Sequence, residues 1–362
     1  TDPQLADIEG GGHDPKRRGF TFQQAEVSFF GAVDPYFNAE AHIVYKSDGV
    51  ELEEAYGTTS QLPYRLQLKA GYYLTEFGRT NPQHPHQWPW LDQAVVITRI
   101  FGKDGNRSVG GRLSWLAPVP WFSEFLVGMQ NADDPTEVSY LGGEPDPAQP
   151  ATISGRPAIA RTTTRSLADF LYALRWVNNW EVGEQTMVQL GLSSAFGPNN
   201  TGPAGRTMVV GGDLLVKWRE RQRGIPSLVW QTEVIARRYH ADAVVDPVTA
   251  AAIPADDLRD WGITSQALVG FHPRWAGGLR VDYASGSGDS YAIGIGPVSR
   301  ETDAYRDDRW RLSPLVTFSP SEFSKIRLQY DYDHLEHLPN HDVQSVWIGL
   351  ELMIGAHPAH TY

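Results

Sequence analysis

The sequence predicts an all-β protein: a transmembrane, antiparallel, up-and-down β-barrel of about 16 strands, with 14 as the fallback number. Three observations predict this fold. Apolar and polar residues alternate with period two along many segments, aromatic residues gather at the ends of these segments, and the connections between them alternate between short and long. We therefore expect one barrel domain over residues 1–362, with short periplasmic turns and long extracellular loops.

The period-two alternation is clearest in "KIRLQYDYD", where Ile326 and Leu328 point to one side of a strand and Arg327 and Gln329 to the other. The same pattern recurs in "YRLQLKAGYY", "GGDLLVKWRE", "SLVWQTEVIARR", "GLRVDY" and "SVWIGLELMI". In a soluble sandwich the apolar face meets a second sheet, whereas in a membrane barrel it meets lipid and the polar face lines a lumen. Segments of about 10 residues match a tilted membrane-spanning strand, so we favour the barrel over a sandwich or a propeller.

The strands can be counted along the chain from Phe20, which gives about fifteen. The first clear strand, "FTFQQAEVSFFGAV", runs into a short turn, so an even-numbered barrel needs a strand before it, and "PQLADIEG" is the candidate. Long loops are expected over residues 77–108, 131–165, 239–260 and 286–308, and no helix of any length is expected. At the end of the chain, Tyr362 keeps the outward phase of the last strand and resembles the terminal aromatic assembly signal of outer-membrane barrels.

Composition narrows the class of protein further. The chain has no cysteine, which excludes disulfides, thiolate metal sites and cysteine nucleophiles. Its net charge of −12 argues against nucleic acid as a partner. No apolar run is long enough for a membrane-spanning helix, and the first residues lack the basic and apolar regions of a signal peptide. Together with the strand pattern, this predicts a protein of the bacterial outer membrane, in contact with its lipid, whose signal peptide has been removed.

One long segment carries a family resemblance. It reads "GVELEEAYGTTSQLPYRLQLKAGYYLTEFGRTNPQHPHQWPWLDQ", followed by "FGKDGNR" and "LSWLAPVPWFSEFLVGMQNAD", and the chain ends in "IGAHPAHTY". These motifs resemble a group of porin-like outer-membrane β-barrel proteins often labelled zinc-regulated TonB-dependent outer membrane receptors. The resemblance implies an outer-membrane barrel and, through its label, a connection with zinc. A TonB-dependent receptor has about 22 strands around a plug, which 362 residues cannot supply, so a barrel without a plug domain is implied.

The segment "FGRTNPQHPHQWPWLD", Phe77–Asp92, is the start of the first long loop, residues 77–108. Its three prolines exclude a helix or a central strand and make it stiff. A stiff loop that folds into the barrel suits a pore constriction. The candidate constriction residues are Arg79, His84, His86 and Asp92, which we expect to face the aqueous path, and Trp88 and Trp90, which we expect to anchor the segment against the wall.

Two histidine clusters are candidate metal sites, with zinc as the metal, because zinc prefers imidazole and carboxylate ligands. In the first, His84 and His86 can present both imidazoles on one side of an extended segment. The alternative is that they make ordinary hydrogen bonds in a packed loop. The second cluster, in "DYDHLEHLPNHD", contains His334, His337 and His341, and its alternative is a solvated acidic hairpin. We expect no cofactor to be required.

The alternation also predicts which charged side chains point into the lumen. Inward-phase basic and acidic residues are close to balance, so we expect at most a weak cation preference. The alternative is that these charges pair across strands and stiffen the lumen. The lumen-lining candidates are Arg65, Lys69, Arg112, Lys217, Glu233, Arg237, Arg280, Asp282, Arg327 and Asp331.

The expected function is a porin-like channel for passive passage of small solutes or ions. One alternative is a divalent-metal (zinc) uptake pore, and another is a closed structural barrel that anchors a larger outer-membrane complex. A homo-oligomer is a further expectation for a barrel of this size. An enzyme is not expected, because the chain contains neither G-x-S-x-G nor H-E-x-x-H.

Overall fold

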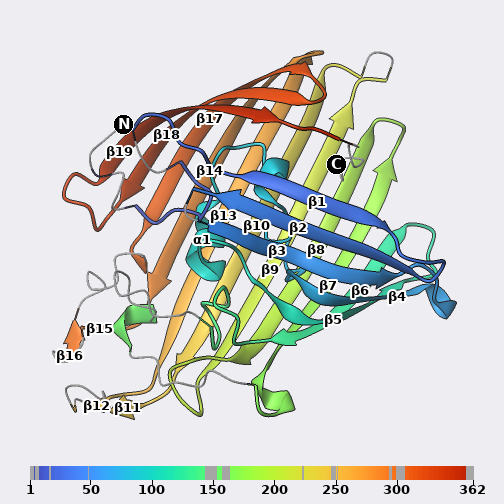
Figure 1. Cartoon of the computed structure of the whole chain (residues 1–362). Coiled ribbons are helices and arrows are strands. Elements are labelled where there is room, and N and C mark those ends of the chain that lie inside the picture. The colour runs from blue at the N-terminus through green and yellow to red at the C-terminus, as the bar shows by residue number, and fades with distance from the viewer. Residues whose placement is uncertain are drawn as a thin grey trace.

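The computed structural model describes residues 4, 8–15, 18–47, 49–142, 153–156, 164–221, 224–245, 250, 252–292, 296–298 and 306–355. Its main element is one sheet of 15 antiparallel strands that follow one another in chain order (Figure 1). The predicted all-β, up-and-down fold is therefore confirmed. The strands of this sheet are β1 (Ala25–Ala32), β2 (Phe37–Lys46), β3 (Gly49–Thr59), β4 (Leu66–Leu74), β5 (Arg107–Leu116), β6 (Phe122–Asn131), β7 (Phe170–Val182), β8 (Thr186–Pro198), β9 (Arg206–Arg219), β10 (Ser227–Ala241), β13 (Asp256–His272), β14 (Trp275–Ser287), β17 (Arg309–Ser321), β18 (Ser324–Leu335) and β19 (Asp342–Leu352).

Two short hairpins lie outside this sheet: β11 (Val244–Val245) pairs with β12 (Ala252–Ile253), and β15 (Ser290–Ala292) pairs with β16 (Gly296–Val298). None of the helices in the described residues is long and apolar enough to cross a membrane. The expected terminal aromatic, Tyr362, lies outside the described residues.

The connections differ on the two sides of the sheet, as the sequence predicts. On one side, which we call the turn side, all are short: residues 33–36, 60–65, 117–121, 183–185, 220–226, 273–274 and 322–323. On the other side, the loop side, they include the long stretches 75–106 and 132–169, but also a connection of only two residues, 47–48. Short and long connections therefore alternate along most of the chain. The clearest exception is the short connection between β2 and β3 on the loop side.

In the wall of the barrel, the exposed face is apolar and the buried face is polar, which is the reverse of a soluble sheet. On β18, Ile326 and Leu328 are 39% and 49% exposed, whereas Arg327, Gln329 and Asp331 are 5%, 0% and 3% exposed. Apolar side chains thus cover the outside and polar side chains fill the inside. Aromatic pairs lie near both rims: Trp310 with Tyr332 towards the loop side and Trp275 with Phe318 towards the turn side. An apolar outer face between two aromatic rows is the surface expected of a barrel in a membrane.

The sheet has two edges, β1 and β19, and no backbone pairing joins them within the described ranges. Because the number of strands is odd, both edges run from the loop side to the turn side. Accordingly, the described residues 9–14 before β1 lie on the inner side of the wall, against the loop 75–106. There, Gly12 N donates to Lys103 O at 2.7 Å, and Asp14 accepts from Gln93 N at 2.8 Å. The described part of "PQLADIEG" contains no strand, so the expected sixteenth strand is not found there.

Residues 75–106, between β4 and β5, fold into the lumen, and we call them the inserted segment. They contain α1 (Val95–Phe101), all of whose residues are buried. The expectation of no helix is therefore wrong. The sequence "VVITRIF" is rich in β-branched residues, but it is enclosed by the barrel, where packing overrides intrinsic propensity. Around α1 lies an apolar core whose members are Phe77, Ala94, Val96, Ile97, Ile100, Phe101, Ala132, Tyr140, Leu141, Leu171, Ala195, Val209 and Ile235.

Glycines in the wall make room for the inserted segment. A Cβ at Gly211 of β9 would lie 3.0 Å from the ring of Phe77, and one at Gly262 of β13 would lie 2.8 Å from Val96 Cγ2. Further along the wall, a Cβ at Gly278 of β14 would lie 3.1 Å from the ring of Trp90. The wall and the inserted segment are therefore complementary in shape, so a larger side chain at these glycines must displace the segment or strain the strand.

We predict that Gly211→Val destabilises the barrel by about 1–3 kcal/mol, because the new side chain overlaps Phe77 in a packed core. The matched control is Gly31→Val on β1, where a Cβ would meet nothing within 4 Å. It should change the free energy of unfolding by less than about 0.5 kcal/mol. Denaturant unfolding in detergent micelles, followed by tryptophan fluorescence, measures both values. Equal effects of the two substitutions would contradict the packing that we describe.

Candidate functional site

The inserted segment is held to distant strands by hydrogen bonds from its main chain and from the Trp90 indole. Gly78 N donates to Ser193 Oγ at 3.0 Å, and Leu91 N donates to Gln329 Oε1 at 2.8 Å. The indole of Trp90 donates to Ser313 O at 2.9 Å, and Trp90 is only 1% exposed. These partners lie on β8, β18 and β17, so the segment crosses the whole lumen. Trp90 therefore lies against the wall, where the sequence analysis expected an anchor.

Glu233 on β10 binds the turn at the start of the segment. It accepts hydrogen bonds from Arg79 N at 3.2 Å, from Thr80 N at 3.0 Å and from Thr80 Oγ1 at 2.7 Å. Gly78 makes this possible, because its φ of 61° turns the backbone and a Cβ there would overlap the Glu233 carboxylate. Arg79 Nε donates to Gln231 Oε1 at 3.2 Å. Arg79 is thus part of the anchoring network as well as of the lumen surface.

Asp92 is the central charge of the segment. Arg280 Nη2 donates to its Oδ1 at 2.7 Å, and Arg311 Nη1 lies 2.5 Å from its Oδ2. Gln329 Nε2 also donates to Oδ1, at 2.6 Å. Burial alone would raise the pKa of Asp92, but Arg280 and Arg311 hold it below its ordinary value. Asp92 is therefore a charged, buried carboxylate enclosed by two guanidinium groups.

A further wall arginine binds the tryptophan-rich stretch. Arg327 Nη1 donates to the carbonyl oxygens of Trp88 at 2.9 Å and of Trp90 at 3.2 Å, while its Nη2 donates to Glu351 at 2.6 Å. The guanidinium of Arg280 lies 5.5 Å from the Trp90 ring centroid. A side chain that the alternation predicts as lumen-lining therefore also fixes the inserted segment.

A large cavity lies on the turn side of the inserted segment, and we call it the vestibule. Its volume is about 3490 Å³. Wall residues near the turn side line it, among them Lys217, Gln231 and Thr317, and the face of the inserted segment from Arg79 to Leu91 forms its inner end. Residues of both sheet edges, β1 and β19, line it as well. The lumen thus holds a wide cavity, lined by both polar and apolar residues, on one side and a packed core around α1 on the other.

His84 and His86 lie at the vestibule beside a group of carboxylates. His84 Nδ1 lies 2.7 Å from Glu53 Oε2, and its Nε2 lies 2.7 Å from Glu54 Oε2. Burial opposes a charge on His84, yet hydrogen bonds to Glu53 and Glu54 raise its pKa well above the ordinary value. His86 Nδ1 lies 3.0 Å from Glu26 Oε2. The imidazoles therefore bind carboxylates of β1 and β3.

One residue of this group, His42 on β2, was not among the sequence candidates. Its ring lies 4.3 Å from that of His84, centroid to centroid, and its Nδ1 lies 2.9 Å from Glu26 Oε1. The donor atoms of Glu26, His42 and His84 all lie within 4.8 Å of one another. The signal in the sequence was the alternation in "AEAHIVYK", which places His42 and Glu40 on the inward face of one strand.

Among the lumen-lining candidates, one is wrong. Arg65 is exposed, because Tyr64 and Arg65 both have positive φ in the turn that precedes β4. The others lie inside the wall. Lys217 lines the vestibule, and the rest form ion pairs or polar contacts. These contacts are Lys69 and Arg112 with Glu76, Glu233 with Thr80, Arg237 with Asp260, Arg280 with Asp282, Arg327 with Glu351, and Asp331 with Ser313.

The second histidine cluster is not brought together as a metal site. His334 lies 2.6 Å from Asp342 Oδ1, and His341 Nδ1 lies 3.2 Å from Leu335 O. Within the part of the chain that the structure describes, the group whose donor atoms converge is Glu26, His42 and His84, and it includes none of His334, His337 and His341.

Comparisons with known proteins support the fold. No protein-family model matches the chain. A protein of Aquifex aeolicus (strain VF5), named only "Uncharacterized protein", is 26% identical over 368 residues, which cover 97% of this chain and 73% of that protein. The outer membrane channel DcaP of Acinetobacter baumannii aligns with a TM-score of 0.52 at 9% identity, over 90% of this chain and 82% of that chain. An anion-selective porin from Comamonas acidovorans aligns with a TM-score of 0.49 at 9% identity, over 91% and 84%.

The likeness to DcaP shows the fold, an outer-membrane-type barrel, and at this identity it shows the fold alone. Neither the Aquifex aeolicus protein nor DcaP carries the zinc-regulated TonB-dependent receptor label of the family that the sequence resembles.

We predict that Asp92→Asn lowers the free energy of unfolding by about 2–3 kcal/mol, because it removes one of the two buried carboxylates that Arg280 and Arg311 share and leaves them only Asp282. The matched control is Asp257→Asn. Asp257 also pairs with an arginine, Arg238, but at an exposed position, so we expect a loss of about 0–1 kcal/mol. Denaturant titration in micelles measures both. A loss no larger than that of the control would show that the buried triad does not hold the segment.

Proposed function

We propose that the chain is an outer-membrane channel for the passive passage of small polar solutes or ions, in which the inserted segment sets the width of the path. The observation that carries the proposal is the wide vestibule, lined by charged as well as apolar residues, that ends on the inserted segment between Arg79 and Leu91. Water and solutes fill such a space readily, and the inserted segment is the element that they must pass. The barrel fold shared with DcaP is consistent with this function.

The charges at the vestibule support weak ion selectivity. Acidic side chains such as Glu26, Glu54 and Glu351 line it together with Lys69, Lys217 and Arg327. Many of these charges are paired, for example Arg327 with Glu351 at 2.6 Å. A lining with both signs and no single-sign excess gives little preference between cations and anions. We therefore propose a general small-solute path, of which a zinc-uptake pore would be a more specific form.

A closed structural barrel is the second candidate, and the apolar core around α1 favours it. Ile97, Ile100 and Phe101 are fully buried, which is the packing of a folded interior rather than of a loosely held loop. In that case the inserted segment is a permanent filling and the barrel anchors or partners other outer-membrane components. The two candidates differ in one measurable property, which is whether the intact protein conducts.

We predict that single-channel conductance in planar bilayers rises several-fold when residues 79–104 are replaced by a short Gly-Ser linker. The wild type should give small ohmic steps, because current must pass the packed segment. The control variant carries the same linker in the exposed turn 183–185 and should conduct like the wild type. A silent wild type with a conducting deletion variant would favour the closed barrel. Silence from both, in folded and inserted protein, would overturn the channel.

A further inference from the structure

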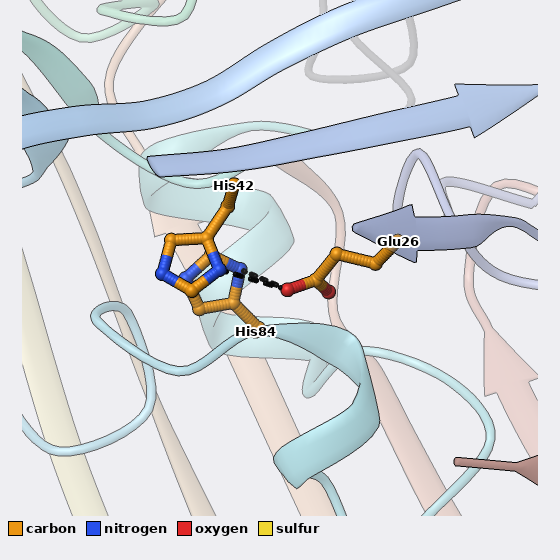
Figure 2. A group of neighbouring side chains, drawn as sticks. All are labelled: Glu26, His42 and His84. Carbon is orange, nitrogen blue, oxygen red and sulfur yellow. Dashed lines mark hydrogen bonds and ion pairs between the residues drawn. The ribbon is translucent and has the colours of Figure 1, made fainter. Parts of the chain in front are cut away.

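We propose that Glu26, His42 and His84, with Glu53 as a fourth ligand, form a binding site for a divalent transition metal ion of the zinc class at the inner end of the vestibule. Figure 2 shows the first three side chains pointing toward one another, from β1, β2 and the inserted segment. The inference goes beyond a general solute channel, because it assigns a specific ligand to these residues. The conductance experiment does not test metal binding.

The spacing of the donor atoms suits one ion. Glu26 Oε1 lies 2.9 Å from His42 Nδ1 and 3.9 Å from His84 Nδ1. In a tetrahedral zinc site with bonds of about 2.0–2.1 Å, neighbouring ligand atoms are about 3.3 Å apart. The observed distances fall on both sides of that value. An ion at their centre therefore needs only small side-chain movements.

Glu53 supplies the fourth donor. Its Oε2 lies 2.7 Å from His84 Nδ1, and the residue is 4% exposed on β3. Ser28 Oγ lies 2.9 Å from both His42 Nδ1 and Glu26 Oε1, which adds an oxygen on the β1 side. Two imidazoles and two carboxylates form a ligand set for zinc and related ions, whereas calcium and magnesium prefer oxygen ligands alone.

The outer nitrogen of each imidazole is already held by a second carboxylate. His84 Nε2 lies 2.7 Å from Glu54 Oε2, and His42 Nε2 lies 2.9 Å from Glu40 Oε1. This is the carboxylate–histidine arrangement that orients metal-binding histidines, because a proton fixed on Nε2 directs the lone pair of Nδ1 at the ion. Ion binding would release any proton on Nδ1 to solvent, so no further reactant is needed.

An ion can reach this site from the vestibule. Glu26, His42, His84 and His86 all line the cavity. His86 is bound to the outer oxygen of Glu26, and its side chain is 33% exposed. It therefore stands between the open space and the buried ligands. A bound ion would join β1, β2 and β3 to the inserted segment, at the end of the sheet that has no neighbouring strand.

The test uses the full chain, folded in detergent and stripped of metal with a chelator, and titrated with CoCl₂. We expect one Co²⁺ per chain with the visible absorption of a four-coordinate ion, and ZnCl₂ should displace it. His42→Gln and His84→Gln should each abolish the spectrum. Glu40→Gln keeps every ligand and should weaken binding by about 10–100-fold through the loss of a second-shell contact. The matched control is His334→Gln, which removes another carboxylate-bound histidine and should leave binding unchanged.

Two results would overturn the proposal: wild-type protein that gives no such spectrum, or equal Co²⁺ affinity in the wild type and the His42→Gln, His84→Gln double variant. If either histidine variant fails to fold, the comparison of Glu40→Gln with His334→Gln decides, since equal affinities would then refute the site. Binding is measured without conduction. A failure here is therefore distinct from a failure of the channel, which only the bilayer experiment tests.

Discussion

The structure depends on one electrostatic constraint: charges that the wall directs inward need partners wherever the inserted segment excludes water. Strands with an apolar outer face necessarily turn their arginines and carboxylates into the lumen. A segment that fills this space must therefore supply charge and backbone polar groups, not only apolar packing. Asp92 between Arg280 and Arg311, and the carbonyl groups around Arg327, meet that requirement. These pairs neutralise buried charge beside the apolar core around α1.

The sequence predicted the wall well because one short-range rule governs it. Alternation assigns each strand residue to the lipid or the lumen side, and Arg327, Asp331 and Glu233 all follow it. The rule failed at Arg65, where it was extended past the start of β4 at Leu66 into a turn with positive φ. The sequence also predicted a long, stiff loop over residues 77–108, because the prolines of Phe77–Asp92 exclude a regular helix or strand there. Its inward fold was expected because a stiff loop suits a pore constriction.

What the sequence could not predict was set by contacts between distant residues. The stretch Val95–Phe101 was expected to belong to a long loop, and its β-branched residues do not favour a helix, yet it is helical where the barrel encloses it. The histidine and carboxylate group joins residues 26, 42, 53 and 84 from three strands and a loop. The periodicity places the three strand side chains, Glu26, His42 and Glu53, inward, but it does not apply to His84 in the loop. It does not give the register around the barrel, and so it did not connect His42 with His84.

The chain order of the paired charges has a consequence for how the barrel is assembled. Asp92 leaves the ribosome early, whereas Arg280 and Arg311 lie 188 and 219 positions further along, on β14 and β17. A partial sheet that ends at β10 would hold the inserted segment with its central carboxylate unpaired, which is costly in a space that excludes water. The segment therefore gains its full stabilisation only when the last strands arrive. Such long sequence separations make folding slow and nearly all-or-none, because few of the decisive contacts can form before the chain is complete.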